Sequence, residues 1–283
     1  MTILDRFFKY IHIPTNSNSE TGKTPSTETQ WHLAELLTQE LKQLNMDEVW
    51  LDREHCYVYA FLKGIENAPK IGFIAHMDTS EDVTDINIKP NIIRNYNGET
   101  IPLNDSEILD VNIYPNLKKH IGKTLITTDG HTLLGADDKA GIAEIMTAME
   151  FLVTHPEIKH GKICVAFTPD EEIGRGANNF NIKLFGAEYA YTVDAGPIGQ
   201  IRYDNPNSCR IDIKIEGVFV HPGYAKGKLN NAILIAHEFI SMLPPAESPA
   251  HTEGHEGYYH ISEICGKEAE VNMTLIISEH DKD

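Results

Sequence analysis

The sequence predicts an α/β protein in which helices cover a mixed or parallel sheet, followed by a smaller α+β segment. Two observations lead to this prediction. Apolar, strand-like runs alternate with segments of helical periodicity over residues 1–204, and this alternation is typical of an α/β sandwich. Near residue 205 the order changes to one long strand, one helix and two further strands. We therefore expect two domains, 1–204 and 205–283.

Periodicity assigns the elements of the first domain. Phe7, Phe8 and Ile11 recur at helical spacing, whereas residues 71–75 form a nearly continuous apolar run, as expected of a buried strand. Residues 80–130 are rich in Asn, Asp, Pro and Gly, so we expect excursions over the core there. The expected helices are 4–13, 27–44 and 141–151, and the expected strands are 49–51, 58–62, 70–76, 162–168 and 189–194, the last two also buried.

The second domain begins with alternating apolar and polar residues, which is the period of a strand. The order strand, helix, strand, strand resembles the first two-thirds of a ferredoxin-like α+β unit, in which one more helix and strand follow. The sequence stops before them, so we expect this unit to be incomplete. Its expected elements are a strand over 209–220, a helix over 230–243 and strands over 258–265 and 270–278.

Composition and charge restrict the class of protein. The chain has 24 Lys and Arg against 42 Asp and Glu, a net charge of −18, which argues against nucleic acid and anionic membranes as partners. The excess acid either serves solubility or creates a field that favours cations, including substrates with a free ammonium group. No run reaches the roughly 18 apolar residues of a membrane span. Charges interrupt the apolar N-terminus, so no signal peptide is expected.

The four cysteines are far apart and form no CxxC pair. In a chain of this size, that pattern indicates reduced, mostly packed thiols in a cytoplasmic protein. The cysteines are Cys56, Cys164, Cys209 and Cys265.

Acidic residues and one His follow apolar runs, at positions where α/β sheets build sites. His76 and Asp78 follow the run at 71–75. A His two residues from an Asp either binds a metal ion, with the carboxylate fixing its second nitrogen, or forms an ordinary polar pair at a strand end. Asp194 likewise ends an apolar run.

Two further segments carry adjacent carboxylates. Asp137 and Asp138 open a helix between two glycines; one acid would serve as a helix cap, but two tolerate each other better around a cation. Asp170, Glu171 and Glu172 follow an apolar strand, where consecutive carboxylates repel one another unless they are paired or bind metal. The alternative for this second segment is an acidic loop in solvent.

Together these residues supply one imidazole and several carboxylates, a donor set that suits Zn²⁺, Mn²⁺ or Co²⁺. The sequence has no HExxH, GxSxG, P-loop or dinucleotide-binding fingerprint. We therefore expect a metal centre at the strand ends.

These motifs resemble those of the M20 metallopeptidases and, within them, the peptidase T group of tripeptide aminopeptidases. The resemblance runs over essentially the whole chain and implies a zinc-peptidase-like α/β/α sandwich with an inserted ferredoxin-like lid domain. It also implies two Zn²⁺ per subunit, short peptides such as tripeptides as substrates, and a cytoplasmic homodimer formed through the lid. The segments that carry it are 72–79, 134–141, 167–176, 220–223 and 254–260.

The resemblance implies a role for each residue of the metal centre. His76 would bind one zinc ion and Asp78 would orient it. Asp137 would bridge both ions, with a cis peptide bond between Asp137 and Asp138. Asp194 would bind the same ion as His76.

For catalysis, the resemblance implies that Glu172 binds the second ion and that Glu171 is the general base. His221 of the lid would reach the site of a partner subunit and help to hold the oxyanion; its alternative is a turn His before Pro222. Chains of this family continue beyond residue 283, and the His that completes the second zinc site would lie there. Ser278 also stands near a position where relatives usually carry an Arg that pairs with the substrate carboxylate.

Two alternatives to a working tripeptidase therefore remain at this point. One is a truncated, inactive fragment of such an enzyme. The other is a different M20 amidohydrolase, such as a dipeptidase, deacylase or carboxypeptidase.

Overall fold

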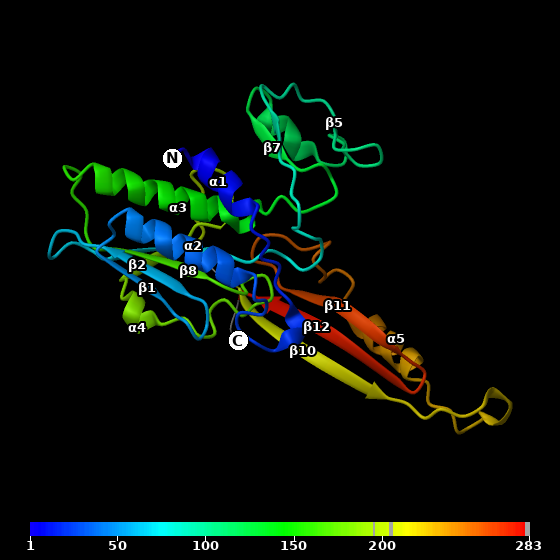
Figure 1. Ribbon diagram of the computed structural model, residues 1–283. Helices are drawn as coiled ribbons and strands as arrows, with labels where there is room; N and C mark the ends of the chain where they lie inside the picture. Colours follow the sequence, from blue (N-terminus) through cyan, green and yellow to red (C-terminus); the bar gives the residue numbers. More distant parts are fainter. Residues whose placement is uncertain (195, 204–205, 281–283) are drawn as a thin grey trace. The chain divides into compact units, whose positions relative to one another are not determined.

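The chain folds into two compact units, Met1–Pro197 and Ile198–Asp283. The computed structural model describes residues 1–194, 196–203 and 206–280. The first unit is built on a five-stranded sheet and the second on a three-stranded sheet (Figure 1).

The sheet of the first unit is mixed, with the order β1-β2-β8-β3-β9. Strands β8, β3 and β9 are parallel, whereas β1, β2 and β8 pair antiparallel. The three parallel strands therefore bring their carboxyl ends to one edge of the sheet. The strands are β1 (Glu48–Leu51), β2 (Val58–Leu62), β3 (Ile71–His76), β8 (Ile163–Thr168) and β9 (Tyr189–Thr192).

Helices cover both faces of this sheet, to different extents. On one face α1 packs on α3, α3 on β3, and α2 on β1 and β2 (Figure 1). They enclose the main core, in which Leu37, Met146 and Phe167 are fully buried. On the other face, Phe185 of the short α4 joins a smaller aromatic cluster around Tyr59. The helices are α1 (Ile3–Ile11), α2 (Gln30–Gln43), α3 (Ala136–Thr154) and α4 (Ile182–Phe185).

The observed arrangement confirms the predicted α/β fold but differs from the prediction in two elements. Every residue of β9 is exposed, so the prediction of a buried strand over 189–194 is wrong. The reason is its position: β9 lies at the edge of the sheet and has a neighbour, β3, on one side only. Helix α3 is also longer than predicted and starts at Ala136, although Asp137 and Asp138 have non-helical backbone angles.

The segment between β3 and α3 forms the expected excursion. It contains two small antiparallel sheets, β4 with β7 and β5 with β6. At its base the buried Asp85 accepts hydrogen bonds from the backbone of Thr15 and the hydroxyl of Thr79. The elements are β4 (Asn91–Ile93), β5 (Ile101–Pro102), β6 (Ile108–Leu109), β7 (Leu125–Thr127) and the 3₁₀ helix η2 (Pro115–His120); η1 (Ser19–Thr21) precedes α2.

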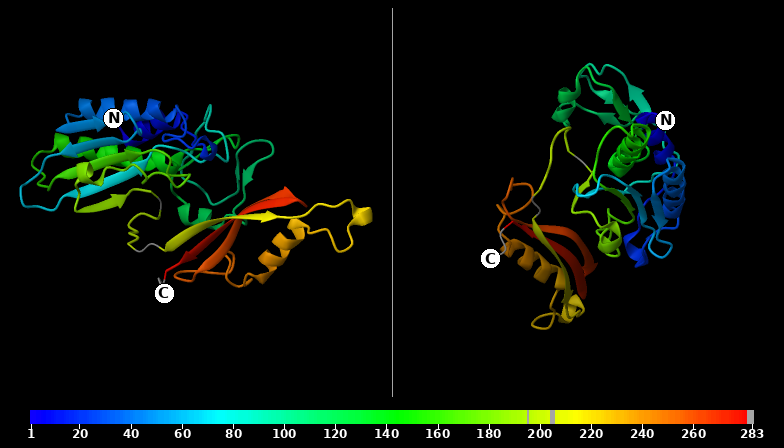
Figure 2. Two further views of the ribbon diagram at one scale, coloured as in Figure 1. Left: turned by 90° about the horizontal axis from the view of Figure 1, so that it is seen from below. Right: turned by 90° about the vertical axis from the view of Figure 1, so that its left-hand side faces the viewer.

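In the second unit, one helix packs on an antiparallel sheet of order β10-β12-β11 (Figure 2). Ala232 and Ala236 of the helix face Val271 and Met273 of the central strand in a small core. The chain order agrees with the predicted β-α-β-β pattern. The elements are β10 (Asn207–Glu216), the 3₁₀ helix η3 (Pro222–Tyr224), α5 (Ala232–Met242), β11 (Tyr258–Lys267) and β12 (Glu270–Glu279).

The thiols are only partly packed. Cys56 and Cys164 are buried, but Cys209 and Cys265 are exposed, and all four are free. The exposed pair lies on β10 and β11, the two edge strands of the second sheet.

No helix among the described residues has the length and apolarity needed to span a bilayer.

Candidate metal centre

Four chain segments meet at the carboxyl edge of the first sheet. β3 ends at His76, β8 leads into the turn with Glu171, and β9 leads to Asp194. The start of α3 contributes Asp137. Because β3, β8 and β9 run in parallel, these positions lie together at one edge, where open α/β sheets place their sites.

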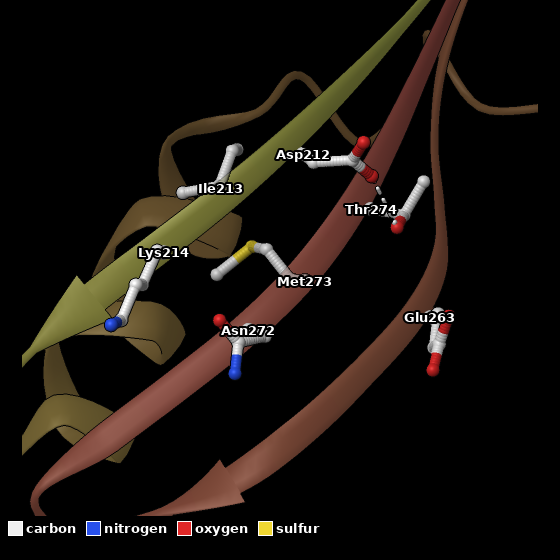
Figure 3. Close-up of a pocket in the computed structure, with 7 residues that line it drawn as sticks. All are labelled: Asp212, Ile213, Lys214, Glu263, Asn272, Met273 and Thr274. Carbon is white, nitrogen blue, oxygen red and sulfur yellow. Dashed lines mark hydrogen bonds between the residues drawn. The ribbon is translucent and has the colours of Figure 1, made fainter.

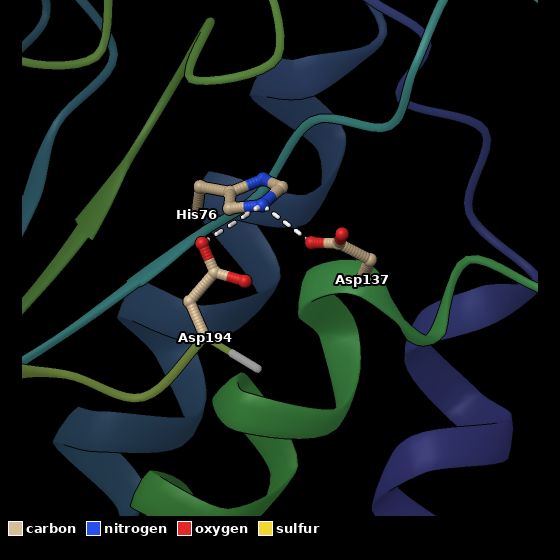
Figure 4. Close-up of side chains that lie close together, drawn as sticks. All are labelled: His76, Asp137 and Asp194. Atoms are coloured by element: carbon tan, nitrogen blue, oxygen red, sulfur yellow. Dashed lines mark hydrogen bonds and ion pairs between the residues drawn. The ribbon is translucent and has the colours of Figure 1, made fainter. Parts of the chain in front are cut away.

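The imidazole of His76 lies at the centre of this group. Its Nε2 is 2.8 Å from Asp137 Oδ1, 3.8 Å from Asp194 Oδ2 and 3.9 Å from Glu171 Oε2. Figure 4 shows the carboxylates of Asp137 and Asp194 pointing at this nitrogen from two sides. The His76 side chain is only 2% exposed, whereas those of Asp137 and Glu171 are 66% and 53% exposed. The site therefore has a buried floor, formed by His76, and an open mouth lined with carboxylates.

Asp78 contacts both His76 and the turn that carries Glu171 and Glu172. The His76 Nδ1 lies 3.0 Å from the backbone oxygen of Asp78 and 3.4 Å from its carboxylate. The Asp78 carboxylate also accepts the backbone amides of Glu171 (2.9 Å) and Glu172 (3.1 Å). Since Asp78 is fully buried, it fixes the acidic turn as well as bordering the imidazole.

The peptide bond between Asp137 and Asp138 is cis, as the family resemblance implies. Asp138 is buried; its carboxylate accepts the amides of His76 and Gly141, each at 3.2 Å. Asp137 and Asp138 therefore act in different directions: Asp137 faces the open site and Asp138 faces the backbone of β3. The family resemblance gave a metal role to Asp137 but no role to the carboxylate of Asp138.

The site has a strong preference for positive charge. Burial disfavours the charged form of His76, but the hydrogen bonds with Asp137 and Asp78 outweigh it and raise the pKa of His76 to about 11. The pKa of Asp137 is lowered, first by the hydrogen bond with His76. Burial raises the pKa of Asp194 and, to about 8, that of Asp138. The carboxylates around His76 thus favour the positively charged form of its imidazole.

A divalent cation would offset the negative charge of these carboxylates. One ligand atom each from His76, Asp137 and Asp194 can be chosen so that all lie within 4.8 Å of one another. An imidazole nitrogen with carboxylate oxygens is a donor set that Zn²⁺ and similar ions accept. The residues present therefore fit a metal ion at Nε2 of His76.

Three predicted site residues remain. Glu171 and Glu172 lie beside the metal centre, and His221 lies in the second unit. Glu171 and Glu172 follow each other in the turn after β8, and burial raises the pKa of both carboxyl groups. His221 precedes η3 of the second unit, where its Nδ1 accepts the amide of Gly223 at 3.2 Å. Ser26 and Gln30, which bind the adjacent Asp170, were not predicted to matter. Neither lies near an acidic motif in the sequence, so no local signal identified them.

A separate hollow of about 150 Å³ lies on the sheet of the second unit (Figure 3). Two of its three charged side chains, Asp212 and Lys214, are already paired. Lys214 lies within 3.1 Å of Glu216 and within 3.0 Å of Glu270, and Asp212 accepts from Arg210 and Thr274. Among the described lining residues, only the exposed Glu263 carboxylate is left without an ionic partner, and a single exposed carboxylate does not make a binding site. The residues that line the hollow are Asp212, Ile213, Lys214, Glu263, Asn272, Met273 and Thr274.

Known proteins resemble the chain in both sequence and fold. Residues 203–281 match the model of the peptidase dimerisation domain of the M20 family. The chain is 53% identical to a peptidase T of Halothermothrix orenii, over 97% of this chain and 68% of that protein.

Two solved structures share the fold. A tripeptidase from Staphylococcus aureus has a TM-score of 0.69 at 23% identity, over 99% of this chain and 66% of that one. A dinuclear metal-binding M20 peptidase from Bacillus subtilis has a TM-score of 0.54 at 15% identity, over 99% of this chain and 64% of that one. The chain thus spans about two-thirds of the length of these relatives.

Proposed function

Because the chain belongs to the peptidase T family of M20 metallopeptidases, we propose that it is a metal-dependent aminopeptidase that releases the N-terminal residue of tripeptides. The observation that carries this proposal is the convergence of Asp137, Asp194 and Glu171 on Nε2 of His76. The names of the relatives support the substrate class, since they include a peptidase T and a tripeptidase.

We assign His76, Asp137 and Asp194 to one zinc ion, and Asp137 and Glu172 to a second. The ions would polarise the scissile carbonyl and lower the pKa of a water molecule. The protein's own contribution is to hold these ligands still. Asp78 does so by bonding the amides of Glu171 and Glu172, and Asp138 by bonding the amide of His76.

Glu171 is our candidate for the general base. Its carboxylate lies at the open mouth of the site, 3.9 Å from His76 Nε2, and is not the nearest acid to that nitrogen. A base at this place can accept a proton from the attacking water and return it to the leaving amine. Its raised pKa, caused by burial, suits both steps.

We assign to His221 the role of holding the oxyanion of the substrate in the site of a partner subunit, in a cytoplasmic homodimer. The match of residues 203–281 to a dimerisation domain supports this assignment. An imidazole that donates a hydrogen bond to the developing oxyanion would stabilise the transition state.

Replacing Glu171 tests the proposal. We expect Glu171→Gln to lower kcat for a tripeptide by roughly 10²–10⁴-fold while zinc content is unchanged, because the base is lost and the ligands remain. Zinc is counted by atomic emission and release of the N-terminal residue is followed by chromatography. Glu157→Gln, an exposed acid away from the site, is the control.

Three results would contradict parts of this assignment. Near-normal turnover by Glu171→Gln would remove Glu171 as the base. A chain that binds zinc but cleaves neither tripeptides nor dipeptides would be an inactive fragment. Hydrolysis of dipeptides or N-acyl amino acids in preference to tripeptides would identify another M20 amidohydrolase.

A further inference from the structure

We propose that Asp170 is a positioning residue, whose buried carboxylate locks the turn that carries Glu171 and Glu172 onto the start of α2. The proposal rests on the roles given to those two glutamates above. In this proposal Asp170 contacts neither the metal ions nor the substrate. It acts by holding the backbone of the turn in place.

The contacts of Asp170 are numerous for a residue in a turn. Its carboxylate accepts the amide of Ser26 at 2.8 and 3.0 Å, the hydroxyl of Ser26 at 2.6 Å and the side-chain amide of Gln30 at 2.7 Å. Asp170 and Gln30 are fully buried. Among the residues that the structure describes, no Lys, Arg or His nitrogen lies within 4.0 Å of this carboxylate. Neutral donors alone therefore stabilise it.

A buried carboxylate without a cationic partner is costly unless hydrogen bonds replace its water. The native position of Asp170 is thus tied to the positions of its donors. Ser26 is itself fixed, because its hydroxyl accepts the amide of Asn18 at 2.9 Å. Gln30 is the first residue of α2, a helix of the main core. The turn is consequently anchored to a rigid element 140 residues away in sequence.

The backbone of the turn transmits this anchor to the glutamates. Asp170, two residues after the end of β8, has a left-handed φ of +56°; Asp is one of the few residues that adopt this conformation readily. Its backbone oxygen accepts the amide of Arg175 at 2.9 Å, and that of Glu171 accepts the amide of Gly174 at 2.7 Å. Asp78 holds the other side through the amides of Glu171 and Glu172. The turn is therefore clamped between Asp78 and Asp170.

Substitution of Asp170 by Asn tests the clamp. Asn keeps the size and tolerates the left-handed backbone, but places an NH₂ group against donors. We expect kcat to fall roughly 10–100-fold with KM little changed, because no substrate contact is lost. We also expect weaker binding of the zinc ion assigned to Glu172, measured by titration of the metal-free chain.

A third measurement does not depend on catalysis or on metal. In the metal-free chain, we expect hydrogen–deuterium exchange over residues 169–175 to be faster in Asp170→Asn than in the wild type. The control is Asp110→Asn, whose carboxylate also accepts a turn amide, that of Asn112, in the excursion between β3 and α3. It should leave exchange at 169–175 and zinc affinity unchanged.

A paired substitution provides a rescue. In Asp170→Asn with Gln30→Glu, the new amide at position 170 can donate to the new carboxylate at position 30, so exchange, zinc affinity and kcat should recover in part. Gln30→Glu alone should be as harmful as Asp170→Asn, because two carboxylates then face each other.

The outcomes separate this proposal from the function itself. Unchanged exchange over 169–175 in Asp170→Asn, or normal kcat with only a lower Tm, would overturn the positioning role. If the wild-type chain has no peptidase activity, the proposed function fails, but faster exchange and weaker zinc binding in Asp170→Asn would still support the clamp.

Discussion

Individual side chains in this protein often act on the backbone of another segment. Asp78, Asp138 and Asp170 each direct a buried carboxylate to backbone amides of a different segment. A carboxylate in this arrangement holds the backbone of a segment that carries a reactive group. The carboxylate itself does not contact the substrate. This explains how an open group of exposed acids can keep a defined geometry before a metal ion binds.

In the helical layer, Arg6 links three helices through its side chain. It is buried between α1, α2 and α3, with Nη1 3.1 Å from Glu40 and Nη2 2.8 Å from Glu150. The hydrogen bond from Arg6 lowers the pKa of Glu150 below its ordinary value of 4.5. A lowered pKa in the folded state means that the stabilisation is present above the unfolded pKa and is lost as pH falls through the folded value.

We therefore expect Glu150→Gln to reduce the free energy of unfolding at about pH 7, with the difference from the wild type shrinking as pH falls below about 4. Urea unfolding of the metal-free chain at several pH values measures this. Glu144→Gln, an exposed acid on the same helix, should show no such trend. A Glu150→Gln difference of equal size at both pH extremes would mean that charge is not the cause.

At the scale of elements, the site depends on how closely α3 approaches the end of β9. A Cβ added at Gly141 would lie 2.0 Å from the backbone oxygen of Val193 and 2.4 Å from Asp138 Oδ1. Backbone atoms cannot yield as a flexible side chain can. Any larger residue must therefore push away either Asp138 or the segment that leads to Asp194.

We expect Gly141→Ala to lower the unfolding free energy by about 1–3 kcal/mol and zinc affinity by roughly 10–100-fold, even though Ala favours helix. Calorimetric zinc titration and urea unfolding measure the two effects separately. Glu144→Ala, on the exposed face of the same helix, is the matched control. If Gly141→Ala bound zinc normally, the close approach would not be what places Asp194.

The elements also show which sequence signals are reliable. The strand over 58–62 has the predicted bounds, and the apolar positions Ile142, Ile145, Met146 and Met149, which recur at helical spacing in α3, are buried. Apolar alternation is a local property, so the sequence carries it. The exposure of β9 is not local, because it depends on where the strand lies in the sheet.

At the scale of the whole molecule, the proposed dimer makes a catalytic test possible. Two inactive chains, Glu171→Gln and His221→Ala, should restore activity when mixed, because one kind of heterodimer site combines an intact Glu171 with His221 from the partner. With random exchange, about one site in four would be intact. Turnover of a tripeptide after mixing and incubation, with sedimentation to establish the dimer, is the measurement.

Failure to restore activity in a confirmed, exchanging dimer would show that His221 does not act across subunits. A monomer with undiminished wild-type activity would reject the dimer requirement altogether. Glu157→Gln mixed with His221→Ala is the reference, because about half of the sites are then intact whether or not subunits exchange, so its activity should not change on incubation.

The sequence by itself determined the residue types that end each strand, the α/β alternation, and a family resemblance that the relatives confirm. It could not determine the hydrogen-bond partners of the buried acids. The family resemblance gave Asp78 the role of orienting His76, but no sequence signal pointed to its hydrogen bonds with the amides of Glu171 and Glu172. Ser26 and Gln30 gave no signal at all.

The physical reason is separation along the chain. Periodicity and apolar runs report the immediate neighbours of a residue, and those suffice to place a strand or a helix. The partner of a buried carboxylate depends on which strands lie side by side and on which loop covers their ends. Only the tertiary structure decides that, and here it brings Asp170 onto α2 and Asp137 onto His76.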